Sequence, residues 1–234
     1  MVEPLALNVL PDADAVAREA ARVIAAEARA AVAARGRFLM AVSGGRTPWQ
    51  MLRDLAQEQV PWSGVHVFQV DERIAPPGDP DRNLTHLRES LLSHAPLPPD
   101  QIHAMPVEEP DSLVASHNYS KTLEHWAGSP PVLDLVHLGM GADGHTASLI
   151  PGDPVLEVHN AEVAVTGVYQ KRRRLTLTYP VLNRARKILW VITGAEKQPM
   201  LQRLLAGDTG IPSGRIVRST ASILADQAAR GGTV

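Results

Sequence analysis

Strand-like and helical segments alternate along the chain, and this alternation limits the possible fold more than any other feature. Short apolar runs at residues 38–42, 65–70 and 187–193 are typical of buried strands, and a helical pattern follows each of them. Such alternation is typical of parallel strands that are joined by helices. We therefore predict an α/β fold with an open, mostly parallel sheet and helices on both faces.

The other expected elements follow from the same pattern. We expect further strands at residues 5–10, 102–105, 132–138, 163–168, 175–178 and 216–218. We expect helices at residues 14–35, 48–57, 84–92, 111–126, 196–205 and 221–229. Asp12 or Asp14 is placed to cap the first helix, and Gly36 is placed to end it.

The composition fits one globular domain. Of 234 residues, 44% are hydrophobic and 21% are charged, which is ordinary for a protein with a real core. A chain of this length is often a single α/β domain, so we expect one domain over residues 1–234. The formal net charge of −2 gives no general attraction to nucleic acid or to an anionic membrane, and neither is an expected partner.

Cysteine is absent, which excludes disulfides, thiolate chemistry and cysteine-ligated metal. The start of the chain lacks a basic region followed by a long apolar core, so no signal peptide is expected. No run approaches the roughly 18 apolar residues of a membrane span. We therefore expect a cytoplasmic protein.

The segment VLDLVHLGMGADGHTASLIP, residues 132–151, places candidate catalytic residues just after an expected strand. Its apolar start stops at Gly139, and Asp143 and His145 follow, with His145 at the expected start of a short helix. Open α/β sheets bind ligands just beyond the carboxyl ends of their strands. An imidazole there suits a general base that works near neutral pH, although His145 could instead only cap a turn. Asp143 either orients the imidazole or occupies a turn position with positive φ.

The same segment matches G-x-G-x-x-G through Gly139, Gly141 and Gly144, but its context differs from a dinucleotide site. That fingerprint opens a long helix and has an acidic residue about 20 positions further on. Here Pro151 and Pro154 end any helix after about two turns, because proline lacks the N–H donor and clashes with the preceding turn. We therefore expect no nicotinamide cofactor.

A glycine turn follows the strand-like run 38–42 and reads SGGRTP. Gly44 and Gly45 let backbone N–H groups approach an anion, and the start of the following helix adds partial positive charge. Thr47 belongs to this candidate phosphate site. The alternative is an ordinary tight turn in which Thr47 caps the helix.

Other strand ends carry charges. Residues 71–73 (DER) end a strand, where Asp71 can hold sugar hydroxyls and Arg73 can hold phosphate. The alternative is a surface ion pair, which contributes little. A basic run (KRRR) ends at Arg174, directly before the next strand, and Lys197 lies near the start of a helix. Arg174 and Lys197 are therefore further candidate cations.

Together these motifs resemble the family of glucosamine-6-phosphate isomerases and 6-phosphogluconolactonases. SGGRTP, DER with a later Asn83, GMGADGHTASLIP, RRLTLTYPVLN and the TG…K pattern stand in that family's order over about residues 38–200. The resemblance implies an α/β sheet of Rossmann-like topology, of the isomerase/lactonase type. It also places Asn83 among the substrate-binding residues.

Two stretches favour the lactonases within the family. The isomerases continue their G-x-G-x-D-G-H motif toward I-A-F-N-E-P, whereas His145 is followed here by TASLIP and that glutamate is missing. The isomerases also have D-E-Y where this chain has Asp71, Glu72 and Arg73. The resemblance thus implies hydrolysis of 6-phospho-D-glucono-1,5-lactone in the oxidative pentose phosphate pathway, without a cofactor.

The resemblance also implies roles. His145 would activate water, N–H groups of the glycine turn would stabilise an oxyanion, and Arg73, Arg174 and Lys197 would hold the phosphate with the loop after the strand at residues 38–42. The expected partner is a small sugar phosphate, and the expected state is a monomer or weak homo-oligomer. None of the nine histidines shows metal-binding spacing, so no metal is expected.

Sugar-phosphate sensing domains of some transcription regulators look like this same fold, and they are the non-enzyme alternative. Such regulators usually need a DNA-binding module. Because strand-like sequence begins by residue 5, we expect no such module before it.

Overall fold

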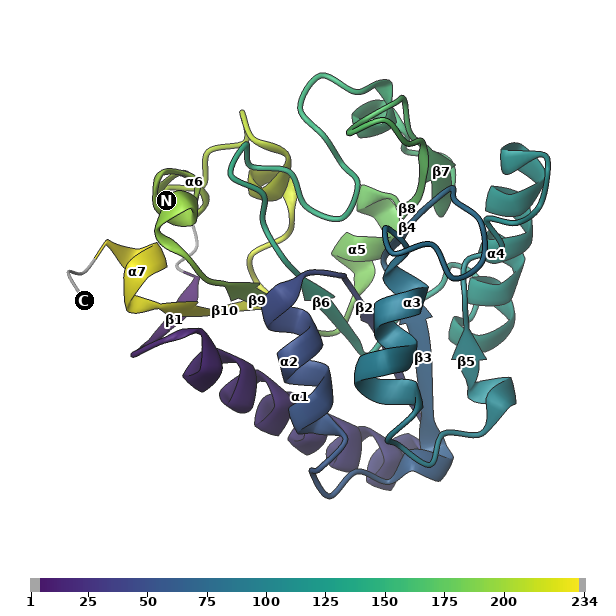
Figure 1. Ribbon diagram of the computed structural model, residues 1–234, viewed down its shortest axis with the longest axis horizontal. Coiled ribbons are helices and arrows are strands. Elements are labelled where there is room, and N and C mark those ends of the chain that lie inside the picture. The colour runs from purple at the N-terminus through teal and green to yellow at the C-terminus, as the bar shows by residue number, and fades with distance from the viewer. Residues whose placement is uncertain (1–4, 232–234) are drawn as a thin grey trace.

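The computed structural model describes residues 5–231, and its centre is a sheet of seven parallel strands (Figure 1). The strand order is β1-β10-β9-β6-β2-β3-β5. In that order the strands are Ala6–Leu10, Ala221–Asp226, Ile188–Ile192, Leu135–Leu138, Phe38–Val42, Val65–Gln69 and Ile102–His103. The predicted open, parallel α/β sheet is confirmed. Residues 1–4 and 232–234 of the expected domain lie outside the described residues.

Helices cover both faces of the sheet, as predicted. One face packs against α1 (Ala13–Arg35), α2 (Arg46–Leu55) and α3 (Asn83–Leu87). The other face packs against α4 (Ser112–Ala127), α5 (Tyr179–Arg184), α6 (Gln198–Leu205) and α7 (Gln227–Arg230). A π turn at Arg88–Leu92 extends α3, and 3₁₀ turns lie at Trp62–Gly64, Pro99–Gln101, Pro154–Glu157, Ala195–Lys197 and Pro212–Arg215. Among the described residues, no helix is long and apolar enough to cross a membrane.

The central strands are apolar throughout because both of their faces are buried. In β2, Leu39 and Ala41 belong to the core beneath α4 and α5, whereas Met40 and Val42 belong to the core beneath α1 and α2. The side chains of a strand alternate between the two faces of a sheet, so one apolar run supplies both cores. This double burial explains why the strand at residues 38–42 could be predicted from the sequence.

The first helix is set by its two ends. Asp12 is the N-cap, and its Oδ1 accepts a hydrogen bond from Ala15 N at 2.7 Å. Gly36 ends the helix with φ of 73°, a left-handed conformation that suits glycine. Both predicted signals are confirmed, with Asp12 rather than Asp14 as the cap.

A second sheet was not predicted. It contains three antiparallel strands in the order β4-β8-β7, which are Asp71–Arg73, Arg174–Leu177 and Val163–Val165. Figure 1 shows these strands close to α4 and α5, at one end of the central sheet. In this ladder Arg73 lies directly opposite Arg174. The pairing therefore brings together two of the candidate cations from distant parts of the sequence.

Three predicted elements are wrong. Residues 221–229 do not form one helix, because β10 pairs with β1 and β9 on both sides and is followed by the short α7. Residues 216–218 form no strand, since a 3₁₀ turn and irregular backbone take their place. The short helix expected at His145 is a series of turns, in which Thr146 bridges to Leu149. Tertiary pairing overrides local propensity in the first case.

Candidate active site

A cavity of about 720 Å³ opens at the carboxyl edge of the central sheet. Its walls are the segments that follow β2, β6 and β9, together with residues of β4, β8 and β10. This is where ligands bind to open parallel sheets. The walls include nine of the ten predicted site residues: Gly44, Gly45, Thr47, Asp71, Arg73, Asn83, His145, Arg174 and Lys197.

The tenth predicted residue, Asp143, holds the imidazole of His145. Its Oδ1 lies 2.6 Å from His145 Nδ1 and also accepts the His145 backbone N–H at 3.1 Å. A proton on Nδ1 that points to the carboxylate leaves Nε2 free to accept a proton. Of the two roles considered for Asp143, the orienting contact is present, and Asp143 is not among the non-glycine residues found with positive φ.

The Asp143 carboxylate stays ionised. Partial burial raises its pKa, but the attraction of His145 and the hydrogen bonds from the His145 ring and backbone outweigh this effect. The pKa of Asp143 is therefore below its usual value. An ionised carboxylate is the form that can orient the imidazole and stabilise its positive charge.

Gly141 makes room for this pair. A Cβ atom at Gly141 would lie 2.1 Å from His145 Nδ1 and 2.5 Å from Asp143 Oδ1. The backbone N–H of Gly141 donates to His145 O at 2.8 Å, and that of Gly144 donates to Gly141 O at 3.0 Å. These two N–H groups close the turn, so the expectation that the glycine turn offers them to an oxyanion is wrong for both.

The glycine loop after β2 approaches a second segment closely. A Cβ atom at Gly44 would lie 2.0 Å from Asn83 Oδ1, and Gly45 has φ of 129°. Gly45 is the N-cap of α2, and no side chain caps this helix. The Thr47 hydroxyl instead lies 2.6 Å from the Thr193 hydroxyl. The alternative in which Thr47 caps the helix is therefore wrong, and the first N–H groups of α2 are free of side-chain caps beside the cavity.

A buried histidine supports the same loop. Ser43 N donates to His137 Nδ1 at 3.2 Å, and Ser43 Oγ donates to His137 O at 3.0 Å. Full burial lowers the pKa of His137 to about 3, so the ring stays neutral and its Nδ1 can accept. His137 is a hydrogen-bonded core residue rather than a ligand of the cavity.

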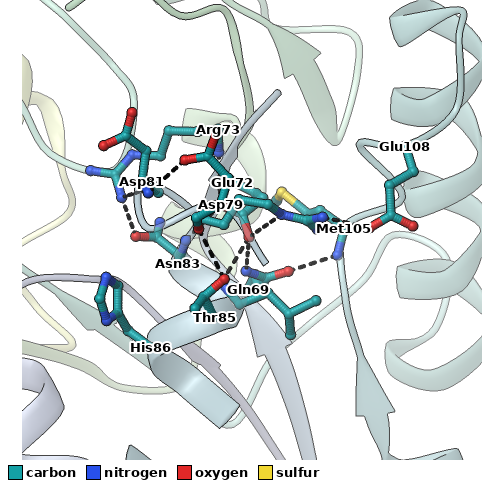
Figure 2. A network of polar contacts seen from close by, with 12 residues as sticks. Gln69, Glu72, Arg73, Asp79, Asp81, Asn83, Thr85, His86, Met105 and Glu108 are labelled. Carbon is teal, nitrogen blue, oxygen red and sulfur yellow. Dashed lines mark hydrogen bonds and ion pairs between the residues drawn. The ribbon is translucent and has the colours of Figure 1, made fainter. Parts of the chain in front are cut away.

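Glu72 is fully buried. Figure 2 shows it within a network of polar contacts that also includes Arg73 and Asn83. Its two oxygens accept backbone hydrogen bonds from Arg73, Asn83 and Leu84 at 2.7–2.8 Å. The Arg82 guanidinium lies 3.5 Å away and supplies the opposite charge. Glu72 therefore fixes the backbone of Arg73 and Asn83 and has no part in the cavity wall.

The side chains held in this way contact one another at the cavity. Arg73 Nη1 donates to Asn83 Oδ1 at 2.5 Å, and Asn83 Nδ2 donates to the Asp71 backbone oxygen at 2.9 Å. Ser148 Oγ donates to Asp71 Oδ2 at 2.6 Å. The wall thus presents an ordered carboxylate beside an amide and a guanidinium, a combination suited to hydroxyl groups and anions.

Arg174 is a buried cation with neutral partners. Its side chain donates to Ser148 Oγ at 3.4 Å and to Gln170 Oε1 at 3.1 Å, and its buried Nε has no partner. Desolvation lowers the pKa of Arg174, yet a guanidinium stays charged in proteins. A buried charge is costly unless it is paired, so an anion bound in the cavity would stabilise the Arg174 guanidinium.

The other basic residues of the KRRR run point elsewhere. Arg172 forms ion pairs with Asp79 at 2.9 Å and with Asp81 at 3.3 Å. Arg173 Nε donates to the Thr166 backbone oxygen at 3.2 Å. Arg174 is thus the member of the run that lines the cavity, as predicted from its place next to the strand.

Several cavity residues were missed by sequence reasoning. Arg46 stands inside the quoted SGGRTP motif and could have been chosen there. Thr193 likewise stands in the quoted TG…K pattern. No pattern in the sequence indicated the others, which join the wall from loops and strand ends: Gln170, Glu196 and Asp226. In the part of the chain that the structure describes, no group of three or more His, Cys, Asp or Glu side chains is placed to hold a metal ion.

The sheet and the site together define a class: an α/β protein with a cavity at the carboxyl edge of a parallel sheet, lined by cations and by a histidine. A family model described as glucosamine-6-phosphate isomerases/6-phosphogluconolactonase matches residues 11–225. The chain belongs to this family.

Similar proteins carry the lactonase name. A 6-phosphogluconolactonase of Nostoc sp. is 35% identical over 204 residues, which cover 86% of this chain and 85% of that protein. The human GDH/6PGL endoplasmic bifunctional protein is 37% identical over 70% of this chain, which corresponds to 22% of its own length. The structure of 6-phosphogluconolactonase from Trypanosoma brucei is 26% identical, with a TM-score of 0.87 over 99% of both chains.

Proposed function

We propose that this protein is a lactone hydrolase that converts 6-phospho-D-glucono-1,5-lactone to 6-phosphogluconate, the second step of the oxidative pentose phosphate pathway. The observation that supports this most directly is the His145–Asp143 pair, with 2.6 Å between Nδ1 and Oδ1, beside a cavity lined by Arg73, Arg174 and Lys197. A general base and a group of cations suit the hydrolysis of a phosphorylated lactone.

His145 acts as the general base in this proposal. Its Nε2 takes a proton from water while the water oxygen attacks C1 of the lactone carbonyl. The carbonyl oxygen becomes an oxyanion, and the bond between C1 and the ring oxygen then breaks. The departing oxygen takes the proton back from Nε2, so one water molecule is added and His145 is regenerated.

The groups proposed to hold the substrate all line the cavity: Gly44, Gly45, Thr47, Asp71, Arg73, Asn83, Arg174 and Lys197. The uncapped start of α2 and the cations hold the phosphate, since helix N-termini and guanidinium groups both bind phosphate well. Asp71 and Asn83 offer an acceptor and a donor to sugar hydroxyls. Holding the phosphate positions the lactone carbon near His145.

Hydrolysis of 6-phosphogluconolactone above the uncatalysed background tests the proposal, with wild type beside His145→Ala. We expect the variant to lose at least about 10²-fold in turnover, the typical contribution of a general base. His117→Ala is the matched control, because His117 is exposed on α4 and lies outside the cavity wall.

The outcomes separate the parts of the proposal. Fast turnover that is retained in His145→Ala would refute the base while the activity stands. No turnover by wild type would refute the activity, and ammonia release from glucosamine 6-phosphate would then test the isomerase alternative. Ligand binding without turnover of either compound would support the sensor alternative.

A cytoplasmic location, a single domain and a monomeric or weakly oligomeric state are further proposals. The absence of cysteine suits a reducing compartment, although the bifunctional relative is named for the endoplasmic reticulum. Fractionation of cells that produce the protein at native levels tests the first, and light scattering over a concentration series tests the last.

A further inference from the structure

A tight turn joins β7 to β8 beside the candidate base. Tyr169 N donates to Arg172 O at 2.9 Å and Arg172 N donates to Tyr169 O at 3.2 Å, which closes a turn with Gln170 and Lys171 at its tip. These two tip residues have φ of 50° and 67° without being glycine. Such turns favour glycine or asparagine, because left-handed backbone is strained for other residue types. The contacts made by this turn offset its backbone strain.

The turn places Tyr169 on the pair formed by Asp143 and His145. The Tyr169 hydroxyl donates to Asp143 Oδ2 at 3.2 Å, while Asp143 Oδ1 contacts His145. The Tyr169 ring meets the His145 imidazole edge to face, with 5.7 Å between their centroids. Both oxygens of the carboxylate are thus held from different sides.

The same ring also contacts the buried cation. Arg174 Cζ lies 5.0 Å from the centre of the Tyr169 ring, within the range of a cation–π contact. Gln170, the next residue of the turn, accepts a hydrogen bond from Arg174 Nη2 at 3.1 Å. One turn therefore contacts both the proposed base and the proposed phosphate ligand.

We propose that Tyr169 is a positioning residue for the hydrolysis: its hydroxyl fixes the Asp143 carboxylate that orients His145, and its ring fixes the Arg174 guanidinium. The proposal rests on the function proposed above. In this proposal one side chain contacts both groups, so the position of the Tyr169 ring sets the distance between His145 and Arg174.

The exposure of Asp143 explains why such a support matters. The Asp143 side chain is 40% exposed, and an exposed carboxylate can rotate away from its partner. A hydrogen bond to the second oxygen opposes this rotation and keeps Oδ1 on His145 Nδ1. Without it, His145 would spend more time in orientations or tautomers that cannot take a proton from water.

Two substitutions separate the hydroxyl from the ring. Tyr169→Phe removes the hydrogen bond to Asp143 and keeps the ring against Arg174, so we expect kcat to fall by about fivefold to tenfold with KM within about twofold. Tyr169→Leu removes both contacts, so we expect a similar loss of kcat together with a rise of about tenfold in KM. The split between kcat and KM distinguishes positioning from a general loss of structure.

Tyr179→Phe is the matched control, because the Tyr179 hydroxyl donates to the Pro212 backbone oxygen at 3.0 Å and lies outside the cavity wall. We expect this control to keep the wild-type kcat. A wild-type kcat in Tyr169→Phe would overturn the role of the hydroxyl, and a wild-type KM in Tyr169→Leu would overturn the role of the ring. A fall in kcat that is equal in Tyr179→Phe would also overturn the proposal, as an unspecific effect.

Failure of the proposed lactonase function can be distinguished from failure of the Tyr169 proposal. It would show as an inactive wild type or as an active His145→Ala, whereas failure of the Tyr169 proposal requires an active wild type and an inactive His145→Ala. Histidine nitrogen NMR adds a readout that needs no lactone. We expect His145 to show protonated Nδ1 in wild type and mixed tautomers in Tyr169→Phe, and an unchanged spectrum would contradict the positioning role.

Discussion

At Gly141 the backbone passes so close to His145 and Asp143 that any side chain would occupy the space of their contact. A Cβ atom would lie 2.1 Å from Nδ1 and 2.5 Å from Oδ1. The glycine is therefore needed for its size, and the positive φ of its neighbour Gly144 is a separate requirement.

Gly141→Ala should consequently separate the pair while the rest of the fold is kept. We expect turnover of the phosphorylated lactone to fall at least about 10²-fold, close to the loss expected for His145→Ala. Gly36→Ala is the control, since a Cβ atom there meets nothing within 4 Å and Gly36 lies outside the cavity wall. Equal activities of the two variants would show that the His145–Asp143 contact is not needed for turnover.

Among the elements, α3 owes its position to one buried carboxylate. Glu72 accepts the N–H groups of Asn83 and Leu84 at the start of this helix, and the Gln69 amide donates to it at 3.0 Å. A glutamine at this position would turn an N–H₂ group toward donors and leave Arg82 with one less charge partner.

Glu72→Gln should therefore shift Asn83 and Arg73 at the cavity. We expect KM for the lactone to rise by about tenfold, and we expect stability to fall by about 3 kcal/mol, as is typical when a buried ion pair loses one partner. Steady-state kinetics and urea unfolding measure both. Glu89→Gln, on the exposed side of the adjoining π turn, should change neither, and a Glu72→Gln variant that behaves like it would contradict the role of Glu72.

Some of these elements could be predicted from the sequence, and others could not. The strands at residues 38–42 and 65–70 were predictable because both faces are buried, which leaves an unbroken apolar run. The strand Ala221–Asp226 was mistaken for a helix, since its pairing with β1 and β9 involves residues far along the chain. The propensity of a short segment does not depend on such distant pairing and therefore cannot predict it.

The same distinction applies to the candidate site, where some residues could be predicted from the sequence and others could not. Glycines, His145 and Arg73 stand at the ends of recognisable strands, and strand ends of a parallel sheet meet at one edge, so their convergence could be foreseen. Tyr169 could not be found, because its place depends on the antiparallel β7–β8 hairpin and on a turn without glycine. Whether the residues at the cavity have their proposed roles stays a prediction for the experiments above.

For the whole molecule, three buried histidines link stability to pH. Burial lowers the pKa of His137 to about 3 and that of His103 to about 4, and it also lowers the pKa of His66, whose ring lies 3.1 Å from that of His103. In each case the pKa in the folded protein is below the ordinary histidine value of about 6.5, so the unfolded chain binds more protons between the two values.

The contribution of these histidines to the free energy of unfolding should therefore be fully present above about pH 6.5, and it should fall as the pH is lowered toward 4. Each histidine contributes a slope of at most about 1.4 kcal/mol per pH unit. Urea unfolding between pH 7.5 and 4.5 measures this slope, and a single transition is expected if residues 1–234 form one domain. His137→Leu should reduce the slope, whereas the exposed His117→Leu should leave it unchanged. A midpoint that is constant from pH 7 to 5 would contradict the linkage.

The register of β4 and β8 has one more consequence. Arg73 and Arg174 lie directly opposite each other in this ladder, and like charges in that arrangement repel. A bound sugar phosphate would add a counter-charge to that of the nearby Asp71 carboxylate, and a ligand that binds only the native state raises its stability by mass action. Proteases in the cell act on the fraction of molecules that is unfolded. The lifetime of this protein would then follow the concentration of the sugar phosphate, so that a cell that holds little of this ligand removes the protein faster than a cell that holds more.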